Sequence, residues 1–295
     1  MPVDIFVPYW GDPALLKETV TSVLAQNNTD WVLTVVDDCY PDATVPEFFA
    51  GIDDPRVTYL RNETNQGITE NYRKCVALSN QDIMVILGCD DVLLPNYVDV
   101  VLKAHREFPN ASVIQPGVQI IDETGKVMTS LVDSVKKKLV GPKTTSATEL
   151  RGEPLAVSLL GGNWLYWPSL AFRTEAIRKV NFRDGLPIVQ DLALVMDIVL
   201  QGGSLVHEPT LAFSYRRHTA SASAATLTDG SRFAGDREYA GIAEELCREK
   251  GWNKAAFAAR IRWTSRLHAM TLLPAALKSK RFTAVRATLR HAVGS

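Results

Sequence analysis

In the first third of the chain, short apolar runs alternate with amphipathic stretches. Four runs have the length and apolar content of buried strands: 3–7, 31–36, 56–60 and 83–87. After the first run, Asp12 and Pro13 supply an N-cap and a first helical residue, and an apolar stripe at helical spacing follows them. Further helices are predicted at about 69–78 and after Pro95. Strands that alternate with helices indicate an α/β fold with a mostly parallel sheet covered on both faces.

The pattern is less regular between residues 112 and 222. It contains two short strand-like runs, 112–115 and 118–121, and a loop rich in glycine and aromatic residues at 161–168. A helix is predicted from about Asp191 to Leu200, and from about Arg232 onward the pattern predicts helices only.

Polar clusters follow three of the predicted strands, at Trp10–Asp12, Asp37–Asp38 and Asp90–Asp91. Ligands of open parallel sheets bind at the carboxyl ends of the strands, so three clusters there indicate a site. Adjacent carboxylates suit Mg²⁺ or Mn²⁺, which prefer oxygen ligands and share them with phosphates. Asp90–Asp91 could equally form a turn that caps the next helix. The second acidic pair on a neighbouring strand favours the metal.

Five short motifs, in this order and spacing, resemble the family 2 glycosyltransferases of GT-A fold. They are Val7-Pro8-Tyr9-Trp10, Ser22-Val23-Leu24-Ala25-Gln26, Val35-Val36-Asp37-Asp38, Asn65-Gln66-Gly67, and Ile86-Leu87-Gly88-Cys89-Asp90-Asp91-Val92-Leu93-Leu94-Pro95. The resemblance implies a GT-A catalytic domain over 1–222, with a nucleotide-binding half (1–111) and an acceptor half (112–222). A basic helical region would follow at 223–295.

The resemblance also implies roles for single residues. Asp38 corresponds to the carboxylate that accepts a hydrogen bond from the donor base, and Trp10 stands where the family usually has a tyrosine. Asp91 corresponds to the metal ligand, and Asp90 to a position near the ribose and the metal. Pro8, Asn65 and Gly67 complete the implied donor site. Many members carry a further aspartate where this chain has Gly88.

Two more residues gain roles from the same resemblance. Asp191 corresponds to the catalytic base of the family, which often follows a glutamate where this chain has Gln190, although Asp191 could also cap the helix that follows. His218 corresponds to a histidine that closes over the diphosphate and completes the metal shell. Arg216 and Arg217 beside it are expected to contact phosphate, because guanidinium binds phosphate through two parallel hydrogen bonds.

Three large aromatic residues, Trp164, Tyr166 and Trp167, stand close together in the glycine-aromatic loop. They could form an acceptor platform, since aromatic faces pack against the C–H faces of sugars and against apolar lipid. They could equally belong to the core or to an interface.

Composition limits the class of protein. With 295 residues and 46% hydrophobic content, the chain can form a full core. The four cysteines are scattered without Cys-x-x-Cys spacing, as is typical of reduced thiols in a cytoplasmic protein. The N-terminus lacks the pattern of a signal peptide, and no apolar run is long enough to span a membrane.

The net charge of −1 conceals an asymmetry. Residues 251–295 hold nine Lys or Arg and no acid, which leaves 23 basic and 33 acidic residues, a net charge of −10, in the first 250. This region has two apolar stripes at helical spacing: Trp263, Leu267 and Met270, then Phe282, Val285 and Leu289. Either the stripes cover the core of this chain or form a dimer contact, or they lie on anionic lipid at the inner face of a membrane.

The sequence therefore predicts an inverting, metal-dependent glycosyltransferase. It would use Mn²⁺ or Mg²⁺, a nucleotide-sugar donor, and a carbohydrate or lipid-linked acceptor in polysaccharide, glycolipid or glycoconjugate synthesis, and would not bind nucleic acid. A nucleotidyltransferase is the alternative enzyme, but the loop at 8–12 has neither Lys nor Arg. A non-catalytic carbohydrate- or membrane-binding relative is the other alternative, which Gly88 and Gln190 keep open.

Overall fold

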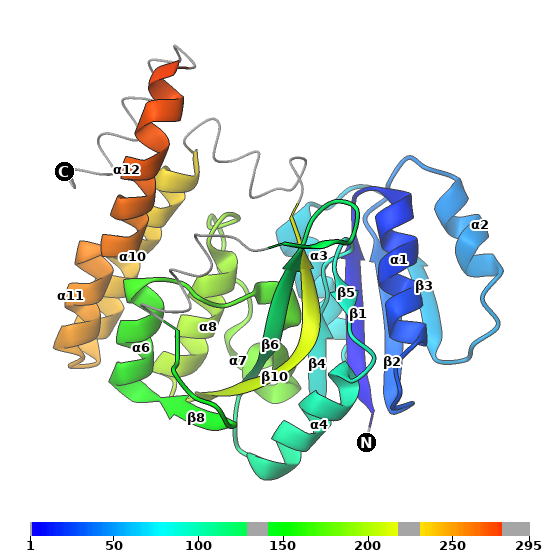
Figure 1. The fold of residues 1–295 in the computed structure, drawn as a ribbon, viewed down its shortest axis with the longest axis horizontal. Coiled ribbons are helices and arrows are strands. Elements are labelled where there is room, and N and C mark those ends of the chain that lie inside the picture. The colour runs from blue at the N-terminus through cyan, green and yellow to red at the C-terminus, as the bar shows by residue number, and fades with distance from the viewer. Residues whose placement is uncertain (1, 129–140, 218–230, 279–295) are drawn as a thin grey trace.

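A ten-stranded mixed sheet forms the centre of the computed structural model, which describes residues 2–128, 141–217 and 231–278 (Figure 1). The strands are β1 (Val3–Tyr9), β2 (Trp31–Asp37), β3 (Val57–Arg61), β4 (Ile83–Ile86), β5 (Val92–Leu93), β6 (Val113–Ile121), β7 (Val127–Met128), β8 (Thr148–Arg151), β9 (Ala171–Arg173) and β10 (Ser204–Arg216). Their order is β3-β2-β1-β4-β9-β6-β10-β5, with β7 beside β6 and β8 beside β10.

The four strands predicted in the first third of the chain are all present and parallel to one another. β9 then pairs antiparallel with both β4 and β6, while β6 and β10 are parallel. The α/β fold with a mostly parallel sheet is thus confirmed. One sheet runs through both halves of the predicted catalytic domain, because β9 joins β4 to β6.

Helices cover both faces of the sheet, and each face has its own hydrophobic core. The helices are α1 (Pro13–Leu24), α2 (Thr44–Ala50), α3 (Ile68–Leu78), α4 (Tyr97–Glu107), α6 (Gly152–Gly161), the 3-10 turn η1 (Trp167–Ser169), α7 (Thr174–Val180), α8 (Gln190–Leu200), α10 (Ser231–Glu249), α11 (Asn253–Ile261) and α12 (Trp263–Lys278). Side chains of β1 alternate between the cores: Ile5 packs with α1 and α4, and Phe6 packs on the face covered by α3 and α8.

The two short runs predicted at 112–115 and 118–121 form the single strand β6. Gly117 stands at the junction, where β10 changes register beside it. A Cβ at Gly117 would lie 2.5 Å from the carbonyl oxygen of Pro209, so the strands can pair through this irregularity only because residue 117 has no side chain.

The C-terminal helices of the described region are predicted correctly, and two of them pack on the catalytic body. Buried residues of α10 and α11, such as Tyr239, Ala243 and Ala259, join the core formed by α6 and α8. The apolar stripe of α12 does not cover that core, because Trp263, Leu267 and Met270 are exposed. The second predicted stripe, at 282–289, lies outside the described residues. No helix of the described ranges is long and apolar enough to cross a membrane.

Candidate active site

The carboxyl ends of β1, β2 and β4 meet at one edge of the sheet. Because β1 is parallel to both neighbours, the residues that follow each strand lie at this same edge. It therefore brings together Trp10, the pair Asp37–Asp38 and the pair Asp90–Asp91, as the sequence pattern predicts.

Asp37 is fully buried at the end of β2, and protein groups occupy its carboxylate. The backbone N–H of Tyr40 donates a hydrogen bond to Asp37 Oδ1 (2.7 Å), and the Tyr59 hydroxyl donates to Oδ2. Arg61 forms an ion pair with the same Oδ2 (2.9 Å). Asp37 thus fastens β2 to β3 and takes no position open to a ligand.

Asp38 is also buried, and it orders the loop before α3. Its Oδ1 accepts hydrogen bonds from Asn62 Nδ2 (2.7 Å) and from the Gln66 N–H (2.8 Å), and its Oδ2 accepts one from the Gly67 N–H (2.8 Å). Gly67 has φ +83°, a conformation that glycine adopts without strain. The predicted contact between Asp38 and the donor base stays a prediction, beside this observed role in shaping the loop.

The loop itself presents Asn65 to solvent. Asn65 Oδ1 accepts a second hydrogen bond from the Gly67 N–H (2.9 Å), so the two predicted donor-site residues of this loop are linked. Behind them, Lys74 donates to Asn62 Oδ1 (2.6 Å). The loop is therefore held in one shape by its own side chains.

Trp10 is the exposed aromatic residue of this edge, with 51% of its surface accessible. It follows half-buried Pro8 in β1, and its ring meets the edge of the Tyr40 ring at 5.2 Å between centroids. Tyr40 was not among the predicted site residues. An exposed indole braced by a second aromatic ring offers a surface on which a base can stack.

Asp91 differs from the other acidic residues of the edge. It is 1% exposed; its Oδ1 accepts a hydrogen bond from the Arg216 N–H (2.8 Å), and its Oδ2 is buried without a hydrogen-bond partner. Burial raises the pKa of Asp91 well above its usual range, and the charge of Asp90 adds to the effect, while Arg216 opposes it. A buried carboxylate oxygen without a partner is costly, so this arrangement favours a cation or a donor group there.

Because Gly88 has no side chain, the two carboxylates can lie close against its backbone. A Cβ at Gly88 would lie 2.4 Å from Asp91 Oδ2 and 3.0 Å from Asp90 Oδ1. Both carboxylates thus point into the volume that a side chain would fill. The aspartate that many family members carry at this position cannot be accommodated with Asp90 and Asp91 as they lie here.

The alternative role of Asp90–Asp91 as a helix cap does not hold. The short strand β5 follows the pair, and α4 begins later, with Asn96 as its N-cap.

Arg216, at the end of β10, is buried behind the acidic pair. Its Nε donates to the carbonyl of Asp90 (2.7 Å), and its guanidinium forms an ion pair with Glu18 of α1 (2.6 Å). The prediction that Arg216 contacts phosphate is therefore wrong, since protein groups occupy its guanidinium. Arg217 is half-buried, and its N–H donates to Ile121. His218 lies outside the described residues.

Asp191 lies in the first turn of α8 and is half-buried. It is not the N-cap, which is Val189. Its neighbour Gln190 is buried and accepts a hydrogen bond from Thr69 Oγ1 (2.9 Å), which fixes the start of α8 against the start of α3. Gln190 therefore has a structural role where the family usually has a carboxylate.

Tyr215 connects the two acidic regions. Burial, together with the smaller effects of the charges of Asp91, Asp90 and Asp191, raises its pKa to about 12, while Arg217 opposes them. The hydroxyl thus lies close enough to respond electrostatically to all three carboxylates. The sequence analysis did not identify Tyr215, although its place at a strand end beside Arg216 was a usable signal.

The match to a family model decides the assignment: residues 4–166 match the model described as glycosyl transferase family 2. The chain belongs to glycosyl transferase family 2. The match covers the acidic pairs, the Asn65–Gly67 loop and the first aromatic residues of the 161–168 loop. Membership in this family also decides against the nucleotidyltransferase alternative.

Curated relatives agree with the family. The chain is 28% identical to the putative colanic acid biosynthesis glycosyl transferase WcaA of Escherichia coli over 36% of this chain and 38% of that protein. It is 22% identical to the succinoglycan biosynthesis protein ExoO of Rhizobium meliloti over 72% of this chain and 60% of that protein. The chain thus spans less than two thirds of the length of these relatives.

Solved structures share the fold of this family 2 glycosyltransferase. The structure of Staphylococcus aureus TarS residues 1–349 in complex with UDP-GlcNAc covers 99% of this chain, which in turn covers 82% of it, with a TM-score of 0.70 and 13% identity. A second structure of TarS residues 1–349 gives a TM-score of 0.66, also at 13% identity, and the match covers 99% of this chain and 81% of that one.

The aromatic residues of the predicted acceptor platform separate in the structure. Trp164 is buried and donates to Ser158 Oγ (3.0 Å), and Trp167 is buried against Tyr72 and Phe172. These two residues belong to the core of the glycosyltransferase, which is one of the two roles that the sequence left open for them. Tyr166 is half-buried, and its ring packs against that of Tyr215 (5.4 Å between centroids), so it alone of the three adjoins the site.

A divalent cation fits the acidic pair by one observation, the buried Oδ2 of Asp91, which has no hydrogen-bond partner. Within the described ranges, no group of three or more His, Cys, Asp or Glu side chains could hold a metal by itself. Such a set is not required, since Mg²⁺ is commonly held by one or two carboxylates and substrate phosphates. Asp91 and Asp90 are the residues that would hold it.

Proposed function

We propose that this family 2 glycosyltransferase moves a sugar from a nucleoside-diphosphate sugar to an acceptor hydroxyl, with inversion at the anomeric carbon, in the synthesis of a polysaccharide or another glycoconjugate. One observation carries the proposal. Asp90 and Asp91 lie at the same sheet edge as exposed Trp10, and the buried Oδ2 of Asp91 has no hydrogen-bond partner.

The donor half supplies the parts that a nucleotide requires. Trp10 offers an aromatic face for the nucleotide base, and Asp38 holds the ordered loop that ends at Gly67. A divalent cation held by Asp91 and Asp90 would offset the negative charge that develops on the leaving diphosphate. The relatives named for colanic acid and succinoglycan biosynthesis and the TarS complex with UDP-GlcNAc support such a donor and such a product class.

Asp191 is the proposed general base. It would take the proton of the acceptor hydroxyl as that oxygen bonds to the anomeric carbon and the bond from this carbon to the diphosphate breaks. The bond between Gln190 and Thr69 holds the start of α8 in place, so the Asp191 carboxylate has a fixed position. Tyr215, whose pKa responds to the charges of Asp191 and of the acidic pair, packs against the ring of Tyr166.

Binding tests the donor, and turnover tests the base. A panel of UDP-, dTDP- and GDP-sugars with Mn²⁺ should contain one that raises the melting temperature, because a ligand that binds only the folded state stabilises it. With that donor and an acceptor, Asp191→Asn should lower kcat by roughly 10²–10⁴-fold, as expected for loss of a general base. Asp53→Asn, at an exposed aspartate after α2, is the matched control and should leave kcat unchanged.

Product stereochemistry tests inversion directly. The anomeric configuration of the product, read from its proton NMR coupling constant, should be opposite to that of the donor. Retention of configuration, or normal turnover by folded Asp191→Asn protein, would reject the mechanism.

A further inference from the structure

An apolar surface lies on α11 and α12, away from the sheet edge that holds the acidic pairs. Four large hydrophobic side chains there are exposed: Phe257 (57%), Trp263 (41%), Leu267 (47%) and Met270 (54%). Among the side chains that the structure describes, they are four of the ten exposed large hydrophobic residues, and they fall within 14 consecutive positions. We call these four residues the α11–α12 surface.

The geometry of α12 makes part of this surface a continuous stripe. Trp263, Leu267 and Met270 are four and three residues apart, so they lie within roughly 60° of one another around the helix. Ala269 points to another side, where it is buried against Phe233 of α10. Ser265 adds a hydrogen bond to Asp236 of the same helix (3.0 Å). One side of α12 is thus fastened to α10, and the stripe faces outward.

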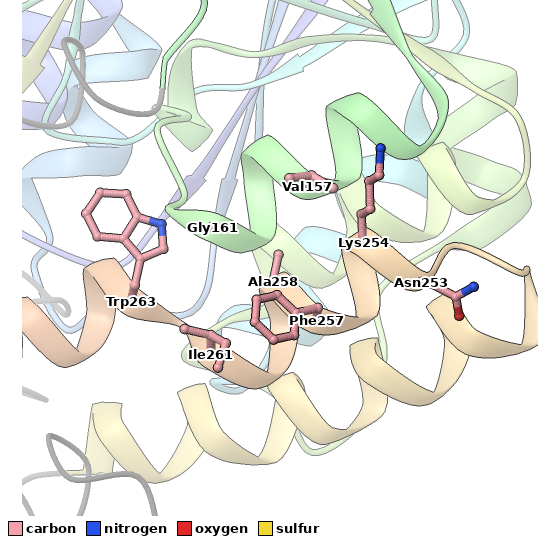
Figure 2. A pocket seen from close by; sticks show the side chains of 8 residues that line it. All are labelled: Val157, Gly161, Asn253, Lys254, Phe257, Ala258, Ile261 and Trp263. Carbon is pink, nitrogen blue, oxygen red and sulfur yellow. The ribbon is translucent and has the colours of Figure 1, made fainter.

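The stripe continues into a groove between α6 and α11 (Figure 2). The groove has a volume of about 460 Å³ and is lined mainly by apolar side chains, among them Val157, Phe257 and Ile261. Figure 2 shows Trp263 at one end beside Gly161, and Lys254 at the other. Thr264 Oγ1 donates to the carbonyl of Gly161 (2.8 Å), which fixes the start of α12 to α6.

Positive charge surrounds this apolar surface. Residues 251–278 contain Lys254, Arg260, Arg262, Arg266 and Lys278 and no acid, in a chain with a net charge of −1. Lys254 and Arg260 are exposed on α11, and the guanidinium of Arg260 lies 5.6 Å from the ring of Phe257. Acids of neighbouring helices lie close as well. Glu153 of α6 accepts the N–H of Lys254 (2.7 Å) and so caps α11, and Asp236 and Glu244 of α10 act on the half-buried Arg262.

We propose that the α11–α12 surface docks on a bilayer that contains anionic phospholipid. Exposed aromatic and aliphatic side chains flanked by Lys and Arg are the chemistry that inserts into the boundary between headgroups and acyl chains. A second copy of this chain fits less well, since a two-fold interface brings the same patch of both copies together and would set basic residues against basic residues. This inference stands apart from the proposed reaction, and donor binding does not depend on it.

The docked surface would lie one short loop from the acceptor side of the site. Gly161, which α12 contacts, begins the segment that ends at Tyr166, and the Tyr166 ring packs against Tyr215. A protein docked in this way would present that side of the site near the membrane surface, where a lipid-linked acceptor is held.

Vesicle sedimentation of the full chain tests the proposal. The protein should sediment with vesicles of phosphatidylcholine and phosphatidylglycerol, bind vesicles of phosphatidylcholine alone much less, and lose binding as salt is raised. The double variant Leu267→Ser/Met270→Ser should weaken partitioning at least about tenfold, because it removes two inserting side chains. Lys254→Gln/Arg260→Gln should weaken it by an order of magnitude or more, at about fivefold for each basic residue.

Matched controls and a second measurement make the result decisive. Leu211→Ser and Lys103→Gln change an exposed apolar and an exposed basic residue elsewhere on the body and should leave partitioning unchanged. Circular dichroism melting of each variant establishes that it is folded. Wild-type protein that stays in solution with anionic vesicles, or variants that bind as wild type does, would overturn the proposal. A dimer in light scattering that the Leu267→Ser/Met270→Ser change dissociates, without vesicle binding by the wild type, would assign the surface to a second copy instead.

Discussion

The two acidic pairs of this sheet edge look alike in sequence and differ in structure. Asp37–Asp38 and Asp90–Asp91 each follow a buried parallel strand, and β1 alone separates those strands. Hydrogen bonds from the chain itself occupy the carboxylates of the first pair. In the second pair, Asp91 has a buried oxygen without a hydrogen-bond partner, close to the backbone of Gly88.

We therefore interpret Asp37–Asp38 as structural residues and Asp90–Asp91 as part of the proposed reaction site. A carboxylate that accepts its full set of hydrogen bonds stabilises the fold, and its removal leaves buried donors unpaired. A buried carboxylate oxygen without a partner destabilises the fold, and a ligand that supplies a cation or a donor offsets this destabilisation when it binds. The two pairs should therefore respond in opposite ways to the same substitution.

The largest effect should come from Asp91→Asn. We expect kcat/KM to fall roughly 10²–10³-fold, or about 3–4 kcal/mol, because the change removes the charge that would hold the cation opposite the leaving group. Steady-state kinetics with the donor found by the binding panel measures it. Near-normal turnover by Asp91→Asn would mean that Asp91 has no role in the reaction, and the proposed functional difference between the pairs would be wrong.

Asp38→Asn should act on stability instead. The amide group that replaces one oxygen cannot accept the hydrogen bond of Gly67 or of Gln66, so the free energy of unfolding should fall by about 1–3 kcal/mol. Urea denaturation followed by tryptophan fluorescence measures the change. If the stability stayed at the wild-type value, the scaffold role of this pair would be wrong.

Gly88→Ala tests whether the position of the Asp91 carboxylate matters for activity. The added Cβ would lie 2.4 Å from Asp91 Oδ2, so the carboxylate must move, and we expect kcat/KM to drop about tenfold with little change in stability. Gly241→Ala is the matched control, since a Cβ there meets nothing within 4 Å. Equal activities of the two variants would show that the position of the Asp91 carboxylate is unimportant.

The smallest effect concerns the stability of Asp91→Asn without metal. Burial raises the folded-state pKa of Asp91, so between the unfolded and folded pKa values the folded protein binds more protons than the unfolded protein does. The free energy of unfolding of the wild type therefore falls as pH rises through that window. Asn cannot ionise, so in a chelating buffer the variant should melt a few degrees higher than the wild type at neutral pH.

The same measurement at acid pH supplies the control. Below the unfolded-state pKa of about 4, Asp91 is protonated in both states, and the advantage of the variant should vanish. A variant that melts lower than the wild type at neutral pH would mean that the ionised Asp91 carboxylate has stabilising partners for both oxygens in the folded protein.

Much of the fold follows from periodicity in the sequence. The four strands of the donor half, the helices between them and the edge where the acidic pairs meet depend on local patterns of apolar residues, and the structure has them as predicted. Tyr166 was likewise placed near the site, although the two tryptophans beside it turn into the core.

The hydrogen-bond partners of each carboxylate could not be predicted, because they come from residues far along the chain. Asp91 is held by the backbone of Arg216, 125 residues away, and Asp38 is held by a loop whose shape depends on the φ of Gly67. Arg216 looked like a phosphate ligand because its sequence neighbours are basic. Its burial follows from the position of β10 in the sheet, which no local pattern contains.

Binding of a nucleotide and a cation compares the two pairs most directly. The increase in melting temperature caused by UDP or GDP together with Mn²⁺ would be measured for wild type, Asp91→Asn and Asp38→Asn. We predict that the nucleotide with Mn²⁺ stabilises the wild type, that Asp38→Asn keeps a Mn²⁺-dependent increase from its lower baseline, and that Asp91→Asn loses it. An Mn²⁺-dependent increase in Asp91→Asn as large as that of the wild type would contradict the assignment of this pair to the donor site.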